Sequence, residues 1–352
     1  MKSPWYGKLF QRAAEKDLIA FRQRASAGDA EAQYQLALRL GTGHGTGQNH
    51  AEAAQWYLKA AEQGHAEAQN ALGLCLDEGT GVERDPAEAI KWYRKAADQG
   101  HAAAQSNLGL SYRKGEGVTK DLEEAARWFR LAAEQGYPDA EYSLGLAYSR
   151  GEGLPQDSAR AVKWLHKAAE KGEATAMHRL ARELHKKADK GSAFREAAKW
   201  YRAAAEQGVV DAMFYLAQLH TEGSGVAENF VESAAWLQKA AEQHHAPAQY
   251  ELGQRHQAGQ GVPPNPAEGA KWFRRAADQG HVPAQLLLGR CYLEGKGVSL
   301  DITRAYRWFA IAANLGSKDA AIERDRITGA LTAEQMAEAR KRVAEFTPQR
   351  NT

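Results

Sequence analysis

Histidine, cysteine and glycine are the residue types in this chain whose chemistry could build an active or metal-binding site. The chain holds twelve histidines and two cysteines, Cys75 and Cys291, and its glycines alternate along residues 41–47. His178 and His185 stand seven residues apart, a spacing that can place two metal ligands on one face of a helix. No third ligand at a matching spacing accompanies them. We therefore expect no metal site.

The glycine-rich segment and the cysteines also lack the surroundings that catalysis needs. A phosphate-binding loop follows a strand and ends in Gly-Lys-Ser/Thr, and residues 41–47 have neither neighbour. No nucleophile-and-base motif surrounds either cysteine, and no carboxylate pair is singled out as an acid–base couple. We expect no catalytic residue and no cofactor.

Charge and hydropathy exclude two further classes of function. The 352 residues carry 46 basic and 44 acidic side chains, a formal charge of +2, so no global field favours nucleic-acid binding. No run approaches the ~20 apolar residues that span a bilayer, and residues 1–10 lack the apolar stretch of a signal peptide. We expect a cytoplasmic protein without membrane insertion; earlier removal of a signal peptide would instead fit the periplasm or secretion.

The tryptophans reveal an internal repeat of 36 residues. Eight of the nine follow this single period. They are Trp56, Trp92, Trp128, Trp164, Trp200, Trp236, Trp272 and Trp308. Because eight periodic copies suit a packing column far better than eight cofactor sites, we interpret these side chains as core.

Each unit reads as two helices joined by a glycine loop. Residues 66–77 have a helical spacing of small and apolar side chains, and residues 87–99 form a second helix that ends at Gly100. Asp85 is the predicted N-cap of this second helix, a position that contributes about 1 kcal/mol. The cap recurs at Asn49, Asp85, Asp121, Asp157, Asn229, Asn265 and Asp301. Only Ala193 breaks the column.

Helix pairs of constant length must stack, because a single pair cannot bury its apolar stripe. The chain is therefore predicted to be an all-α solenoid of eight repeats in residues 30–317. Residues 1–29 are expected to form N-terminal capping helices, and residues 318–352 C-terminal capping helices and a tail. In the latter, Thr332 and Gln335 make a capping box. Capped ends favour a monomer.

The repeat resembles the Sel-1-like repeat family over residues 28–317. Repeat three carries the motif as Ala102, Ala104, Gln105, Leu108, Gly109, Tyr112, Gly115, Gly117, Val118, Asp121, Ala125, Trp128, Phe129, Ala132, Ala133 and Gly136. The resemblance implies a right-handed α/α superhelix related to tetratricopeptide arrays. It also implies non-catalytic adaptor roles, often in bacterial signalling, envelope regulation or host interaction.

Some members of this family staple each repeat with a disulfide, and this chain departs from that pattern. Its two cysteines occupy one column six repeats apart. Helices packed 8–10 Å apart would separate them by tens of Å, against the ~7 Å limit of a disulfide. We expect free thiols, as in a reducing compartment.

The resemblance also implies where a ligand would lie. By the tetratricopeptide pattern, the first helix of each repeat lines a concave groove through positions equivalent to Asn70. This column reads Tyr34, Asn70, Ser106, Tyr142, His178, Phe214, Tyr250 and Leu286. Regularly spaced rings could anchor a peptide. The alternative is that they only pack against neighbouring helices.

Charge along the same implied groove is uneven. Acidic residues flank the basic centre at both ends, with Asp77 and Glu78 before it and Glu222 and Glu294 after it. The basic groove candidates are Arg113, Lys114, Arg150, Arg182 and Lys186, with Arg290 towards the end. We hypothesise an acidic or C-terminal peptide at repeats three to five. The alternative is a solvated surface without a ligand.

Repeat five departs from the pattern, since Lys187 and Asp189 replace its loop glycines. This departure marks either a functional site, a flexible joint or drift. His244 replaces a helix-ending glycine, and histidine tolerates positive φ.

Three function classes follow from the sequence. The first is a scaffold that binds a protein or peptide in the groove. The second is an enzyme or small-molecule binder, for instance of a cell-wall fragment. The third is a dedicated regulatory or immunity subunit.

Overall fold

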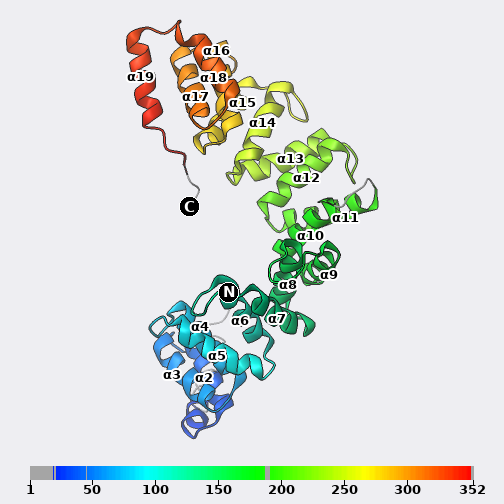
Figure 1. Ribbon diagram of the computed structural model, residues 1–352, viewed down its shortest axis with the longest axis vertical. Helices are drawn as coiled ribbons and strands as arrows, with labels where there is room; N and C mark the ends of the chain where they lie inside the picture. Colours follow the sequence, from blue (N-terminus) through cyan, green and yellow to red (C-terminus); the bar gives the residue numbers. More distant parts are fainter. Residues whose placement is uncertain (1–18, 20, 45, 187–190, 350–352) are drawn as a thin grey trace, which may run out of the picture. The chain divides into compact units, whose positions relative to one another are not determined.

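The chain forms paired helices throughout the part that the structure covers (Figure 1). This computed structural model describes residues 19, 21–44, 46–186 and 191–349. It divides into two units, Met1–Glu173 and Ala174–Thr352. After a helical stretch at residues 21–26, the first unit contains α2 (Ala30–Thr42), α3 (His50–Glu62), α4 (Ala66–Glu78), α5 (Pro86–Asp98), α6 (Ala102–Lys114), α7 (Leu122–Glu134), α8 (Pro138–Arg150) and α9 (Ser158–Glu170).

The second unit continues the same alternation. It contains α10 (Ala174–Lys186), α11 (Ser192–Glu206), α12 (Val210–Glu222), α13 (Phe230–Glu242), α14 (Ala246–Ala258), α15 (Pro266–Asp278), α16 (Val282–Glu294), α17 (Ile302–Asn314), α18 (Lys318–Thr328) and α19 (Ala333–Ala344). We call the even-numbered helices α2 to α16 the A helices, and the odd-numbered helices α3 to α17 the B helices. Within each unit an A helix packs against the B helix of its own repeat and of the repeat before it. The predicted all-helical solenoid of eight repeats is confirmed.

Side-chain caps start the B helices as the sequence predicted. All seven residues of the cap column accept a hydrogen bond from a backbone N–H of the first turn. In repeat five, where Ala193 cannot cap, α11 begins two residues early, at Ser192, after Gly191 and without a side-chain cap. Lys187 and Asp189, the altered loop positions, lie outside the described residues. His244 has the expected positive φ, 62°.

Histidines cap four of the A helices. His65, His101, His245 and His281 each accept the backbone N–H three residues further on through Nδ1, at 3.2–3.3 Å. This role requires a neutral ring, and burial lowers the pKa of His101, His245 and His281. The column of histidines is therefore part of the helix starts.

The tryptophan column lies in the core, as predicted. Six of the eight are buried, and Trp56 and Trp164 are half-buried. In five of the eight repeats the residue after the tryptophan packs on the A helix of the same repeat, where a glycine makes room for it. A Cβ on Gly109 would lie 2.7 Å from the ring of Phe129. The small residue thus sets how closely the two helices approach.

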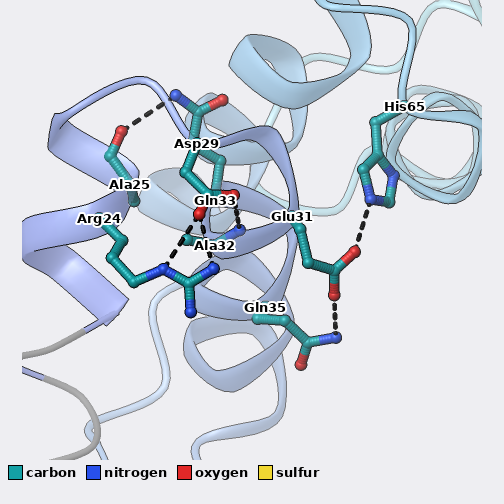
Figure 2. Close-up of polar contacts among 8 residues, drawn as sticks. All are labelled: Arg24, Ala25, Asp29, Glu31, Ala32, Gln33, Gln35 and His65. Carbon is teal, nitrogen blue, oxygen red and sulfur yellow. Dashed lines mark hydrogen bonds and ion pairs between the residues drawn. The ribbon is translucent and has the colours of Figure 1, made fainter.

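In five of the eight repeats a buried glutamine joins the A helix to the end of the helix before it. In Figure 2, the Gln33 amide donates to the carbonyl oxygen of Ala25 at 3.0 Å. Gln63, at the end of the B helix, donates in turn to Gln33 at 2.7 Å. The same pair of contacts recurs at Gln69, Gln105 and Gln249. Each glutamine thus adds a side-chain hydrogen bond to a carbonyl at a buried helix end that also accepts a backbone N–H of the following turn.

Repeat four replaces this amide pair with an ion pair. Glu141 stands where Gln105 would, and Lys171 where Gln135 would. The Lys171 ammonium lies 2.8 Å from Glu141 and 2.6 Å from the carbonyl oxygen of Gly136. The Glu141 side chain is 2% exposed, so the carboxylate depends on that ammonium for its charge balance.

The loop between the helices of one repeat touches the B helix of the previous repeat. Gly117 has φ +72°, and a Cβ there would lie 2.4 Å from the carbonyl oxygen of Pro86, the first residue of α5. Gly81 and Gly153 make the same close approach. Only glycine fits such a contact.

The C-terminal helices cover the last repeat. The predicted capping box of Thr332 and Gln335 is present at the start of α19. Phe346 packs edge-on against Trp308, with ring centroids 5.8 Å apart. Of the N-terminal residues 1–29, residues 1–18 and 20 lie outside the described part of the chain. Both cysteine thiols are free, as expected, and burial raises the pKa of each.

The loop contact predicts different costs for two glycine substitutions at positive φ. Gly100→Ala meets nothing within 4 Å, so we expect only the cost of the left-handed backbone, about 1–2 kcal/mol. Gly117→Ala also forces a Cβ into the α5 backbone and should lose about 1–3 kcal/mol more. Urea unfolding followed by circular dichroism measures both. Equal losses would show that the loop contact is not tight.

The ion pair of repeat four predicts a compensating double substitution. Lys171→Gln leaves the buried Glu141 carboxylate without its cation, and we expect a loss of roughly 2–3 kcal/mol of unfolding free energy. This is less than for a fully buried pair, because the Lys171 side chain is 37% exposed. Adding Glu141→Gln restores the amide pair and should recover most of the loss in the same urea measurement. A double variant as unstable as the single one would contradict this assignment.

Candidate functional site

A pocket opens between the A helices α6 and α8 of the first unit. Its volume is about 460 Å³, within the range of ligand-binding clefts. It is lined by Arg113, Lys120, Leu122, Tyr142, Leu146, Arg150 and Glu152. We call this group the basic pocket. It brings together three of the residues that the sequence analysis assigned to the groove: Arg113, Tyr142 and Arg150.

Positive charge exceeds negative charge in the basic pocket. Of the three cations, only Arg150 has an acidic partner among the described residues, Glu152 at 3.3 Å. Arg113 lies over the ring of Phe129, 5.6 Å from its centroid, and is half-buried. Lys120 forms no ion pair with a described residue and is exposed. The pocket therefore presents two uncompensated cations to solvent.

A second, smaller pocket lies on the other side of α6, between α4 and α6. It has a volume of about 180 Å³ and is lined by Leu74, Asp77, Tyr93, Asn107, Leu110, Ser111, Lys114 and Glu116. We call it the leucine pocket. Lys114 lies 3.7 Å from Glu116, which also receives Arg84. Burial, and then the charge of Glu116, raise the pKa of Asp77. Together with Arg84, the charged residues of the leucine pocket are close to balanced.

Tyr34 and Asn70, the first two residues of the predicted groove column, each contact a residue of the next repeat. The half-buried ring of Tyr34 stacks on His65, the cap of the next A helix, at 5.0 Å between centroids. Figure 2 shows His65 held by Glu31 of α2, with Nε2 2.9 Å from the carboxylate. Asn70 accepts a hydrogen bond from Asn107 at 3.0 Å. These contacts fit the packing alternative, although both side chains remain partly exposed.

In the second unit, His178 lies in an aromatic cluster rather than at the surface. It is 5% exposed, and its ring is 6.0 Å from those of Tyr201 and Tyr215. Burial, with the nearby Arg179 and Arg182, lowers the pKa of His178 to about 4, against the opposing effect of Asp211. His185 also contacts Tyr201, at 6.1 Å. The two histidines thus share one side of α10 and pack there.

The other candidates of the second unit already have partners. Phe214 and Tyr250 lie 4.9 and 5.0 Å from the cap histidines His245 and His281. Arg182 lies over Tyr215 at 5.8 Å. The remaining two form ion pairs, Lys186 with Glu183 at 2.7 Å and Arg290 with Glu323 at 3.2 Å.

Lys120 and Glu152 are pocket residues that sequence reasoning missed. Lys120 can be recognised by comparing it with the residues at the same position of the other repeats. The matching residues Gln48, Arg84 and Gln156 each donate a side-chain hydrogen bond to the carbonyl seven residues earlier, at 2.7–2.9 Å. Lys120 makes no such bond with a described residue, which leaves its ammonium for the pocket.

Metal and membrane sites find no support in the part of the chain that is described. Within it, no three His, Cys, Asp or Glu side chains gather as metal ligands could. Likewise, none of its helices combines the length and apolar character needed to cross a bilayer.

A family model described as Sel1 repeat matches the chain eight times in succession. The matches cover residues 30–65, 66–101, 102–137, 138–173, 174–209, 210–245, 246–281 and 282–317. Their boundaries agree with the helix pairs of the structure. No curated protein matches the chain.

Solved structures with similar repeats come from several bacteria. A Sel1 repeat protein from Oxalobacter formigenes is 33% identical over 90% of this chain and 93% of its own, with a TM-score of 0.67. A protective antigen of uropathogenic Escherichia coli is 30% identical over 94% of each chain, with a TM-score of 0.43. An immunity protein from Pseudomonas aeruginosa is 24% identical over 59% of this chain and 75% of its own, with a TM-score of 0.37.

The buried His178 predicts a loss of stability in acid. Its pKa of about 4 in the folded chain lies below the ordinary value of 6.5. Between these values the unfolded chain binds one more proton than the folded chain. The free energy of unfolding therefore decreases as the pH is lowered through this window, by about 3 kcal/mol in total. His178→Phe removes the titrating group but keeps a ring in the cluster.

Urea midpoints measured from pH 7 to pH 4 test this prediction. The His178→Phe variant should lose less stability than the parent chain over this range, while titration of the carboxylates affects both equally. His50→Gln is the matched control, because His50 is exposed. Parallel pH profiles for the parent and His178→Phe would rule out the proposed titration.

Proposed function

Because the chain belongs to the Sel1 repeat family, a protein-interaction repeat type, we propose that it is a non-catalytic scaffold binding a protein or peptide along its A helices. In this proposal the ligand lies on the partly exposed side chains of the A helices, while the B helices carry the tryptophan core. The protein acts as a monomer in the bacterial cytoplasm, in signalling or regulation.

One observation carries this proposal. Arg113, Tyr142 and Arg150 come from two successive A helices and line one pocket that is open to solvent. A ring flanked by two guanidinium groups is a composition enriched at protein interfaces. Tyr34, Phe214 and Tyr250 add further half-buried rings at the same register of other A helices.

An enzyme or a small-molecule binder is the weaker candidate. Such a site would favour an enclosed pocket that contains a carboxylate or histidine with a strongly shifted pKa. The strongly shifted histidine, His178, packs between tyrosine rings in the core. The basic pocket has one carboxylate, Glu152, and it is paired with Arg150.

Affinity purification with mass spectrometry tests the scaffold function. We compare the parent chain with a variant that carries Tyr142→Ala, Phe214→Ala and Tyr250→Ala. The ring variant should lose at least about tenfold of one abundant bound protein, because rings at interface centres contribute more than about 1.4 kcal/mol each.

The control variant changes three exposed B-helix residues, Arg127→Ala, Lys163→Ala and Lys271→Ala. It should retain the bound protein, and urea midpoints check that both variants are folded. If no bound protein depends on the three rings, or if the purified chain turns over a metabolite, the proposal fails.

A further inference from the structure

We propose that the basic pocket binds an acidic segment of the partner protein, with two neighbouring Asp or Glu side chains placed among Arg113, Lys120 and Arg150. This inference rests on the proposed function and specifies the chemistry of the ligand. Its starting point is the charge of the pocket, in which three cations face the single carboxylate of Glu152. Two further carboxylates would balance that charge.

Lys120 is the residue that sets the pocket apart from its neighbours. In the other repeats of the first unit, the residue at this register is bound to a carbonyl at the end of an A helix. Gln48 binds Gly41, Arg84 binds Asp77 and Gln156 binds Ser149. Lys120 makes no hydrogen bond or ion pair with any described residue and lines the pocket instead. Its ammonium has no role in holding the loop.

The two arginines are already held in place. The Arg113 guanidinium lies on the ring of Phe129, and Arg150 is anchored by Glu152. Side chains fixed before binding lose less conformational entropy when a ligand arrives. A guanidinium also presents a planar set of donors that matches a carboxylate. The pocket is therefore prepared for carboxylates.

The apolar part of the pocket favours an amino-acid side chain over a small inorganic anion. Leu122 and Leu146 line it beside the half-buried Tyr142. The methylene groups of Asp or Glu can pack against these residues while the carboxylates reach the cations. The Tyr142 hydroxyl offers a further donor.

The leucine pocket extends the proposed ligand to a second contact. It lies across α6 from the basic pocket and is lined in part by Leu74 and Leu110. Directly packed helices have axes about 8–10 Å apart, and successive A helices pack less directly, so at least about three residues of extended chain separate the two pockets. We therefore infer an apolar residue three or more positions from the acidic pair. Leu74 is 38% exposed and available to such a side chain.

Fluorescence anisotropy with four synthetic peptides and the full chain tests the proposal. The first peptide has blocked ends and the core Leu-Ser-Ser-Glu-Glu, and the second replaces both glutamates with glutamine. The third replaces the leucine of the first with serine. The fourth keeps the glutamine core but has a free C-terminal carboxylate. We expect the first peptide to bind at least tenfold more tightly than the second, and severalfold more tightly than the third.

Matched charge variants separate the pocket from the general field of the protein. Arg113→Gln with Lys120→Gln should weaken the acidic peptide at least tenfold. Lys163→Gln with Lys318→Gln removes the same charge from exposed positions and should leave the affinity within twofold. Raising the salt concentration from 50 to 300 mM should weaken binding of the acidic peptide to the parent chain more than to the Arg113→Gln, Lys120→Gln variant.

Three results would overturn the inference. They are equal binding of the acidic and glutamine peptides, equal weakening by the two charge variants, and tight binding of the fourth peptide, which would assign the pocket to a chain terminus. The scaffold function is tested separately by the ring variant. A bound protein that is lost from the ring variant but retained by Arg113→Gln with Lys120→Gln would refute the acidic ligand and leave the scaffold function standing.

Discussion

The structure depends on how the end of each B helix joins the A helix of the next repeat. The last turn of a helix has carbonyls without partners inside the helix, and here the next repeat covers that turn. In five of the eight repeats a buried glutamine of the following A helix donates to one of the carbonyls of this turn, in addition to a backbone N–H, as Gln69 does for Ala61 at 3.0 Å. This amide fixes the register between two repeats where it is present, whereas repeats five and six have Met177 and Met213 at the same position.

The chain departs from the amide pair in several repeats. The pair Glu141 and Lys171 keeps a donor at the helix end because lysine reaches the carbonyl of Gly136. At the C-terminal end, Leu315 replaces the glutamine that would donate to Gln285, whose oxygen has no partner among the described residues. The column is thus changed at both members in repeat four, and at one member in repeats five, six and eight.

The repeat period, the helix caps and the helix ends could be predicted from the sequence. Contacts between side chains of different helices could not. Period, caps and helix ends depend on local chemistry, so the roles of Asp85, Gly100 and Thr332 could be read directly. The burial of His178 could not, because it depends on Tyr201 and Tyr215, which belong to other helices. The cap role of His65 was similarly hidden, since histidine is an uncommon N-cap and its column resembles a turn.

The same reasoning indicates where function is to be sought in a chain of this kind. A residue type that recurs in most repeats has a packing explanation, because every repeat solves the same structural problem. Arg113 and Lys120 recur in no other repeat of their columns. Neither side chain satisfies a buried group, and together with Arg150 they place like charges around one pocket, an arrangement that weakens the fold unless a ligand compensates it. Residues that the shared structure of the repeats does not explain are the ones that a binding partner explains.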